Sequence, residues 1–242
     1  PRKLFSIRTF KKIRIKTVVK KDIVIIGSSS EIAAEFIKIC VKNSENVISI
    51  SRSSNVSIEG IQHTQINDYL DDYENIRNII KKLSKPIIIF FNGFLAENRM
   101  HQFPTDEEIA QTDEVNFVIP YTLSQKLNTE SNNISKYIYI STMAAIKPRY
   151  KNYIYGLSKR KLEESVKYIN LPSVLIVRYG KVETKMSKEH KNPPFTLSSE
   201  KAASILYTSL DSAGTKYASF GLLCLGKIIK ILPMQLIRKI KS

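Results

Sequence analysis

Tyr155 and Lys159 lie four residues apart in the segment NYIYGLSKRKLEES, which spans 152–165. In a helix, this spacing places two side chains on one face, one turn apart. A tyrosine phenol can donate its proton to a reacting group, and a neighbouring ammonium lowers a phenol pKa that is ordinarily about 10. The spacing alone is common, so the surrounding elements decide between an acid–base pair and an ordinary solvent-exposed helix face.

Short apolar runs alternate with segments of helical periodicity along most of the 242-residue chain. The run IVII indicates a buried parallel strand, and the apolar spacing of Ile32, Phe36 and Ile39 indicates a helix after it. Strands that alternate with helices predict an α/β fold: a Rossmann-like doubly wound parallel sheet with helices on both faces. The expected strands are 23–26, 46–51, 61–68, 85–93, 135–145 and 173–180, and the expected helices are 30–43, 72–84, 106–128, 152–165 and 198–212.

The turn after the first strand contains residues that suit a phosphate group. Its sequence is GSSSEIA, in which Gly27 can make the sharp turn out of the strand. The serines offer hydroxyl and N–H groups, and the N-terminus of the next helix favours an anion. Glu31 and Ala33 stand where a glycine-rich turn would have its later glycines, so an ordinary strand-to-helix loop remains the alternative.

The end of the second strand indicates which dinucleotide would bind. A carboxylate there would bond the ribose hydroxyls of NAD, whereas this chain has SISRSSN, with no acid. Arg52, flanked by Ser51 and Ser53, suits a 2′-phosphate. We therefore expect NADP(H) as the preferred cofactor and NAD(H) as the alternative. Asp68, at the end of the third strand, is expected either to contact the adenine or to cap the next helix.

Four features follow one another in order along the chain. They are GSSSEI after the first strand, NG after the fourth (92–93), ST after the fifth (141–142), and YGLSK at 155–159. In this order they resemble the short-chain dehydrogenase/reductase family, over roughly residues 23–212. The resemblance implies the doubly wound fold and the NAD(P)-dependent reduction of a ketone to an alcohol.

The resemblance also implies roles for individual residues. Tyr155 would be the proton donor, Lys159 would stabilise the phenolate and hold the nicotinamide ribose, and Asn116 would support a water that leads protons to the lysine. Thr142 stands where the family usually has serine, and Ser141 is the fallback for polarising the substrate carbonyl. The expected catalytic set is therefore Tyr155, Lys159, Thr142, Asn116 and Ser141.

A further segment, VRYGKVETKM, resembles the RPGxVxT strand end of the same family, with Tyr179 in place of proline. The resemblance places Val182 and Thr184 beside the nicotinamide. The complete set expected to bind the cofactor is Gly27, Ser29, Ser30, Glu31, Ile32, Ser51, Arg52, Ser53, Asp68, Asn92, Gly93, Tyr155, Lys159, Gly180, Val182 and Thr184.

A narrower resemblance concerns the substrate. GSSSEIA, KNYIYGLSK, VRYGKVETKM and the tail LGKIIKILPMQLIRKIK are together similar to a subgroup that includes the ketoreductase subunit of bacterial decaprenylphosphoryl-ribose epimerase. This similarity implies reduction of a keto sugar, lipid-linked or free, in surface-polysaccharide or polyprenyl-phosphate sugar biosynthesis. By position, the substrate loop is expected at 186–197, which contains the charged and proline-rich run KEHKNPPF.

Both ends of the chain are basic, and the formal net charge is +16. We expect a basic N-terminal arm at 1–21, a reductase domain at 22–215 and a basic apolar C-terminal tail at 216–242. The arm contains nine basic residues and no acidic one, and the chain after Asp211 contains six basic residues and no acidic one. The tail suits a helix on an anionic membrane surface, or a helix packed on its own domain or on a partner subunit.

Two other functions fit the same sequence. A soluble ketoreductase of acyl or small-alcohol substrates would use the same motifs, and the charge would suit a non-catalytic nucleotide-sensing or nucleic-acid-binding protein. A pure binder has no need of the tyrosine, lysine and asparagine, so we expect an enzyme and no nucleic acid. The chain contains no GxSxG motif of the kind that indicates a hydrolase. The three histidines, His63, His101 and His190, are scattered, so we expect no metal site.

The family resemblance further implies a homodimer or homotetramer, formed through the helices that hold Asn116 and Tyr155. We expect a cytoplasmic protein, with the inner face of the membrane as the alternative that the tail suggests.

Overall fold

The computed structural model describes residues 20–54, 58–96, 103–187 and 192–239. Residues 1–19 of the expected N-terminal arm and 188–191 of the expected substrate loop lie outside this part. The described residues form one sheet of seven parallel strands in the order β3-β2-β1-β4-β5-β6-β9. Its strands are β1 (Asp22–Ile26), β2 (Asn46–Ser51), β3 (Gln62–Gln65), β4 (Ile87–Phe90), β5 (Lys136–Thr142), β6 (Val174–Tyr179) and β9 (Gly214–Tyr217).

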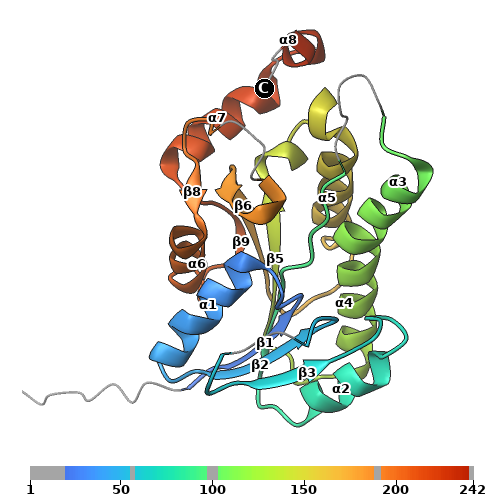
Figure 1. The fold of residues 1–242 in the computed structure, drawn as a ribbon, viewed down its shortest axis with the longest axis vertical. Helices are drawn as coiled ribbons and strands as arrows, with labels where there is room; N and C mark the ends of the chain where they lie inside the picture. The colour runs from blue at the N-terminus through green and yellow to red at the C-terminus, as the bar shows by residue number, and fades with distance from the viewer. Residues whose placement is uncertain (1–19, 55–57, 97–102, 188–191, 240–242) are drawn as a thin grey trace, which may run out of the picture.

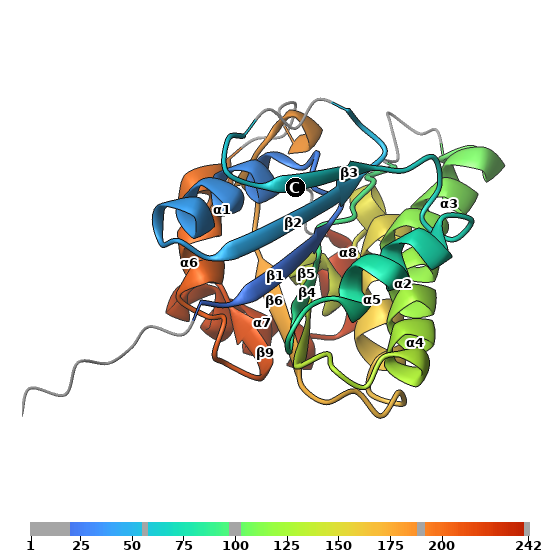
Figure 2. The same cartoon turned by 90° about the horizontal axis from the view of Figure 1, so that it is seen from below.

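Helices cover both faces of the sheet, as Figures 1 and 2 show. The α-helices are α1 (Glu31–Lys42), α2 (Tyr73–Lys81), α3 (Asp106–Asp113), α4 (Ile119–Glu130), α5 (Tyr153–Ser165), α6 (Ser199–Tyr207), α7 (Phe220–Ile231) and α8 (Met234–Lys239). A π-helical turn, η1 (Glu114–Val118), joins α3 to α4, and short 3₁₀ turns are η2 (Met143–Ala145), η3 (Tyr150–Asn152) and η4 (Lys185–Ser187). The two-residue strands β7 (Val182–Glu183) and β8 (Leu197–Ser198) pair outside the main sheet.

The two faces of the sheet bury separate apolar cores. In β1, Ile23 and Ile25 belong to the core under α1 and α6, whereas Val24 and Ile26 belong to the core under α2, α4 and α5. This follows from the strand geometry, in which successive side chains point to opposite faces. A strand apolar at every position therefore requires cover on both faces, which is the layered arrangement that the sequence predicts.

The predicted fold class is confirmed, and every strand and helix expected from the sequence has a counterpart. The seventh strand, β9, was not expected because GTKY is short, lies at the edge of the sheet and is largely exposed. It pairs Lys216 and Tyr217 with β6, so the sheet extends past residue 215. The single helix expected at 106–128 is interrupted by η1, which surrounds Asn116.

Among the residues that the structure describes, no helix has both the length and the apolar character that crossing a bilayer requires.

Candidate active site

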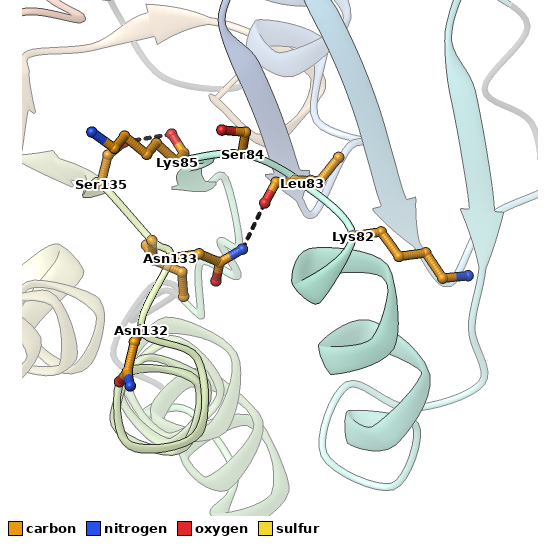
Figure 3. Close-up of a pocket in the computed structure, with 8 residues that line it drawn as sticks. Lys82, Leu83, Ser84, Lys85, Asn132, Asn133 and Ser135 are labelled. Atoms are coloured by element: carbon orange, nitrogen blue, oxygen red, sulfur yellow. Dashed lines mark hydrogen bonds between the residues drawn. The ribbon is translucent and has the colours of Figure 1, made fainter.

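One depression among the described residues lies away from the predicted chemistry (Figure 3). It lies at the amino ends of β4 and β5 and is lined by Lys82–Lys85 and Asn132–Ser135. Asn133 Nδ2 donates to the carbonyl oxygen of Leu83 at 2.7 Å, and Ser135 Oγ donates to that of Lys85 at 2.8 Å. These polar groups join two loops to each other, and doubly wound sheets bind ligands at the opposite edge.

At that opposite edge, the carboxyl ends of β1 and β4 lie side by side where the strand order reverses. Gly27 follows β1 with a φ of +84°, which disfavours any other residue. A Cβ atom at Gly27 would also lie only 2.9 Å from the backbone nitrogen of Asn92. Glycine therefore allows the turn after β1 to pack directly against the end of β4.

Two buried polar atoms at this edge have no hydrogen-bond partner among the described residues: Ser28 Oγ and Asn92 Oδ1. An unpaired buried polar atom costs free energy unless a ligand or water supplies the missing bond. The N-terminus of α1 also lies here, and the side chain of its N-cap residue Ser30 makes no capping bond. Helix N–H groups and the Ser28 hydroxyl beside a glycine turn fit a dinucleotide phosphate, whereas the Asn92 amide oxygen only accepts and suits a ligand hydroxyl.

Arg52 lies just beyond β2, where the sequence predicts contact with a 2′-phosphate. Its guanidinium carbon is 5.9 Å from the ring centroid of the buried Tyr69. Ser51 Oγ donates to the carbonyl oxygen of Ser53 at 3.0 Å, and the same oxygen lies 3.0 Å from His63 Nε2. The loop that carries Arg52 is thus held from two sides.

Tyr69 was not expected in the site. Burial raises the pKa of its phenol, and Arg52, Asn92 and the Gly27 backbone act in the opposite direction, so the phenol is within the influence of these groups. The sequence signal that could have identified Tyr69 is its position directly after Asp68. The Asp68 carboxylate accepts from the backbone N–H groups of Leu70 and Asp71 at 2.7 and 3.1 Å, which form a turn before α2.

Helix α5 packs very closely on the turn that follows β5. A Cβ atom at Gly156 would lie 2.8 Å from the carbonyl oxygen of Ala144, so only glycine fits without a shift. This contact sets Tyr155 beside the end of β5. Thr142 Oγ1 accepts from the Ala144 N–H at 3.2 Å, which leaves the hydroxyl proton of Thr142 available for a substrate oxygen.

Lys159 is buried, and its Nζ donates to the carbonyl oxygen of Asn92 at 2.8 Å. Burial lowers the pKa of Lys159 to about 8, although Glu163 acts to raise it. Burial raises the pKa of Tyr155 to about 12. The shift of the Tyr155 pKa comes from burial, and the stabilisation of the phenolate by Lys159 stays a prediction.

Asn116 is fully buried in the π-helical turn η1, and irregular turns of this kind are frequent at functional sites. Its Oδ1 accepts from the Phe94 N–H at 3.2 Å, and its Nδ2 donates to the carbonyl oxygens of Phe94 and Thr112 at 2.7 and 2.9 Å. The amide thus fixes the backbone after Gly93. Its bonds hold it on the same side of the strand ends as Lys159, and its role in supporting a water that leads to Lys159 stays a prediction.

Ser141 and Thr142 point to opposite faces of β5, so only one of them can serve the substrate. Ser141 Oγ donates to Glu163 Oε1 at 2.6 Å in the protein interior. The hydroxyl proton of Ser141 is therefore engaged with Glu163, and its fallback role stays a prediction.

The segment after β6 lies close to the start of α1. Tyr179, which stands where the family pattern has proline, donates from its hydroxyl to the carbonyl oxygen of Ala202 at 2.9 Å. Gly180 and Val182 follow, and Val182 is buried. Glu31 Oε1 accepts from the Lys185 N–H at 3.0 Å, directly after Thr184. The Glu31 carboxylate therefore links the expected phosphate turn to the residue that precedes the expected substrate loop.

The amino-acid sequence matches no known family model and no curated protein. The structure is similar to a short-chain dehydrogenase from Burkholderia cenocepacia J2315 in complex with NADP, with a TM-score of 0.75, 12% identity and coverage of 90% of this chain and 96% of that one. It is also similar to the ligand-free aldohexose dehydrogenase of Thermoplasma acidophilum, with a TM-score of 0.68, 16% identity and coverage of 85% and 95%.

A third similar structure is a 4-hydroxyisoleucine dehydrogenase complexed with NADH, with a TM-score of 0.64, 20% identity and coverage of 82% of this chain and 96% of that one. At these identities the likeness establishes the fold. The chain has the fold of short-chain dehydrogenases and reductases, in agreement with the resemblance seen in its sequence.

Proposed function

We propose that the protein is an NAD(P)-dependent oxidoreductase that reduces a ketone to an alcohol. The observation that carries this proposal is the 2.8 Å bond from Lys159 Nζ to the carbonyl oxygen of Asn92. This bond joins the helix of the tyrosine–lysine pair to the end of β4, which packs against the Gly27 turn. The residues proposed as proton donor, cation and phosphate-binding turn thus lie at the edge where doubly wound sheets bind ligands, which supports the proposal.

The chain supplies position, charge and a proton, and a bound nicotinamide would supply the hydride. The Thr142 hydroxyl donates a hydrogen bond to the carbonyl oxygen of the substrate, which polarises the C=O bond. As negative charge develops on that oxygen, Tyr155 transfers its phenolic proton to it, and the product is an alcohol. The Lys159 ammonium stabilises the phenolate that remains until a proton from solvent restores the phenol.

The pKa values support this direction of transfer. A Tyr155 pKa of about 12 keeps the phenol protonated at neutral pH, as a general acid requires. A Lys159 pKa of about 8 keeps the ammonium charged at the same pH. Neutral Lys159 would no longer stabilise the phenolate, so we propose that reduction slows above a pH of about 8.

NADP(H) is the proposed cofactor, with NAD(H) as the alternative. Arg52 supports this choice because its guanidinium lies at the end of β2, beside Tyr69. The similar structures named above include complexes with NADP and with NADH. Changing Arg52→Ala is expected to weaken NADPH binding about tenfold to a hundredfold, the value of a charge-assisted phosphate contact, and to leave NADH binding nearly unchanged.

Fluorescence titration with both nucleotides measures this effect. Arg160→Ala is the matched control, since Arg160 pairs with Glu164 on the exposed side of α5. Tyr155→Phe should bind NADPH normally and fail to turn over. Equal weakening of NADPH and NADH by Arg52→Ala would contradict the 2′-phosphate contact, and failure of the parent protein to bind either nucleotide would remove the reductase proposal.

The proposed substrate is a keto sugar, lipid-linked or free, which rests on the narrower sequence resemblance alone. The alternative is a soluble keto-acyl or small ketone substrate. NADPH consumption with a keto sugar phosphate, compared with a β-keto thioester, distinguishes the two. The proposed assembly is a homodimer or homotetramer through α4 and α5, in the cytoplasm.

A further inference from the structure

Helix α7 carries apolar side chains on the face that it turns to solvent. Its inner face is fixed to the domain by Leu222, which is buried, and by Gly226, where a Cβ atom would lie 2.7 Å from the Tyr217 ring. With 3.6 residues per turn, the residues of the opposite face can be read from the sequence. On an ordinary surface helix that face is polar, whereas here it is apolar. This outer face of α7 consists of Phe220, Cys224, Leu225, Ile228 and Ile231, all exposed.

The exposure of these side chains is large. Phe220 is 78% exposed, Ile228 is 51% exposed and Ile231 is 81% exposed. Apolar patches of this kind on a helix mark a contact with another surface. The helix itself is held firmly, because the Leu222 N–H bonds its cap Ser219 at 3.2 Å and Lys147 Nζ donates to the Leu232 carbonyl oxygen at the other end.

The charges around the outer face of α7 identify the kind of surface. Lys227 and Lys230 are exposed along its edge, and no acidic residue follows Asp211 in the chain. A second copy on a two-fold axis would bring the same lysines together, which like-charge repulsion opposes. An anionic surface would instead be attracted, and basic residues that flank exposed apolar ones are typical of helices at a lipid interface.

The outer face of α7 is continuous with a segment beside the candidate active site. The ring of Phe195 lies directly against Gly221, where a Cβ atom would have no room. Phe195 and Met186 are both about half exposed, and the Met186 methyl group lies 3.6 Å from the position of a Cβ atom at Gly93. A surface that contacts α7 would thus lie next to the segment that borders the site.

We propose that the outer face of α7 docks the protein on an anionic lipid surface. Phe220, Ile228 and Ile231 enter the boundary between headgroups and acyl chains, and Lys227 and Lys230 contact lipid phosphates. Docking in this orientation places the side chains of Met186 and Phe195 near the lipid surface, where a substrate with a lipid chain would be presented. The docking rests on α7 itself and does not depend on the proposed reaction.

The test is flotation of the full chain with vesicles of phosphatidylcholine alone or with equal parts of phosphatidylglycerol. We expect binding to the anionic vesicles, weakened by salt and lowered about tenfold or more by the double change Ile228→Ser and Ile231→Ser. Lys227→Glu with Lys230→Glu should lower it similarly without removing apolar surface. The control is Tyr168→Ser, because Tyr168 is 88% exposed and follows the far end of α5.

A native cysteine gives a second readout. Cys224 is exposed on the outer face of α7, whereas Cys40 is buried and burial raises the pKa of its thiol to about 12, so a maleimide dye labels Cys224 at neutral pH. A polarity-sensitive dye there should shift to the blue with anionic vesicles.

Three results would overturn the proposal. The first is no binding to anionic vesicles, and the second is binding that the α7 changes leave intact, which would point to the basic arm at 1–21. The third is a dimer, seen in sedimentation, that the α7 changes dissociate. NADPH affinity, measured on the same variants, reports separately on the proposed function.

Discussion

Changing Lys159→Met is expected to slow ketone reduction strongly and to raise the stability of the fold. Burial lowers the pKa of Lys159 from an ordinary 10.5 to about 8, with Glu163 opposing the change. At neutral pH this corresponds to about 3 kcal/mol of disfavoured charge. Methionine is apolar and of similar length, so it removes the free-energy cost of the buried charge. It also loses one hydrogen bond to Asn92, worth about 1 kcal/mol. The net gain is about 1–2 kcal/mol.

The loss of activity has a different cause from the gain in stability. Without the ammonium, the Tyr155 phenolate has no adjacent cation, and the rate should fall by a factor of about 10² to 10⁴, the usual value of an acid–base group. NADPH consumption measures the rate, and thermal or denaturant unfolding measures the stability. Lys161→Met is the control, because Lys161 is exposed and paired with Asp113, and it should change neither quantity appreciably.

The pH dependence of stability checks the sign of this argument. The pKa of Lys159 is lower in the folded chain than in the unfolded one, so between a pH of about 8 and about 10.5 the unfolded chain binds more protons. Below a pH of about 8, the buried charge of Lys159 therefore lowers the free energy of unfolding of the parent by its full amount. This loss of stability decreases as the pH rises. The advantage of Lys159→Met should shrink towards a pH of about 10. A variant less stable than the parent at neutral pH would contradict the argument.

The sequence predicted the sheet well because its signals are local. Short apolar runs such as IVII in β1 and IIIF in β4 alternate along the chain with amphipathic helices. Runs in this context usually form parallel strands that are buried on both faces. The positions of Gly27 and Arg52 at strand ends followed directly, because the carboxyl ends of parallel strands share one edge.

The details of the candidate site depend on contacts between distant segments. The π-helical turn at Asn116 inserts one residue into a helix that the periodicity extends unbroken. Gly156 is an unremarkable helix residue until α5 packs on Ala144. The choice between Ser141 and Thr142 depends on which face of β5 each occupies, and the burial that raises the pKa of Tyr155 depends on the whole fold.

The largest loss of stability is expected when Glu163 is replaced alone. Its carboxylate is almost fully buried and accepts bonds from Ser141 Oγ at 2.6 Å and from Arg178 Nε at 2.9 Å. Arg178 in turn donates to the Tyr217 hydroxyl at 2.7 Å and lies over the same ring. This buried network joins α5 to β5, β6 and β9. Glu163→Leu leaves the Arg178 guanidinium without its carboxylate partner and should cost about 3–5 kcal/mol.

The double variant Glu163→Leu with Arg178→Met should recover most of that loss, because two apolar side chains in place of a buried ion pair are often neutral or stabilising. Denaturant unfolding of the parent, both single variants and the double variant gives the coupling energy of the pair. Glu164→Leu is the control: Glu164 is exposed and paired with Arg160, so the change should stay within about 0.5 kcal/mol. Additive effects of the two single changes would show that the pair is not coupled.

The same double variant separates a structural role of Glu163 from an electrostatic one. Glu163 lies one helical turn after Lys159 and raises its pKa against the effect of burial. Removing the carboxylate should therefore lower the pKa of Lys159 further, and the alkaline limit of kcat/KM should move to lower pH even where the fold is fully recovered. A purely structural role would leave that limit unchanged in the refolded double variant. A shift of the limit accompanied by normal NADPH affinity would show that Glu163 keeps the Lys159 ammonium charged near neutral pH.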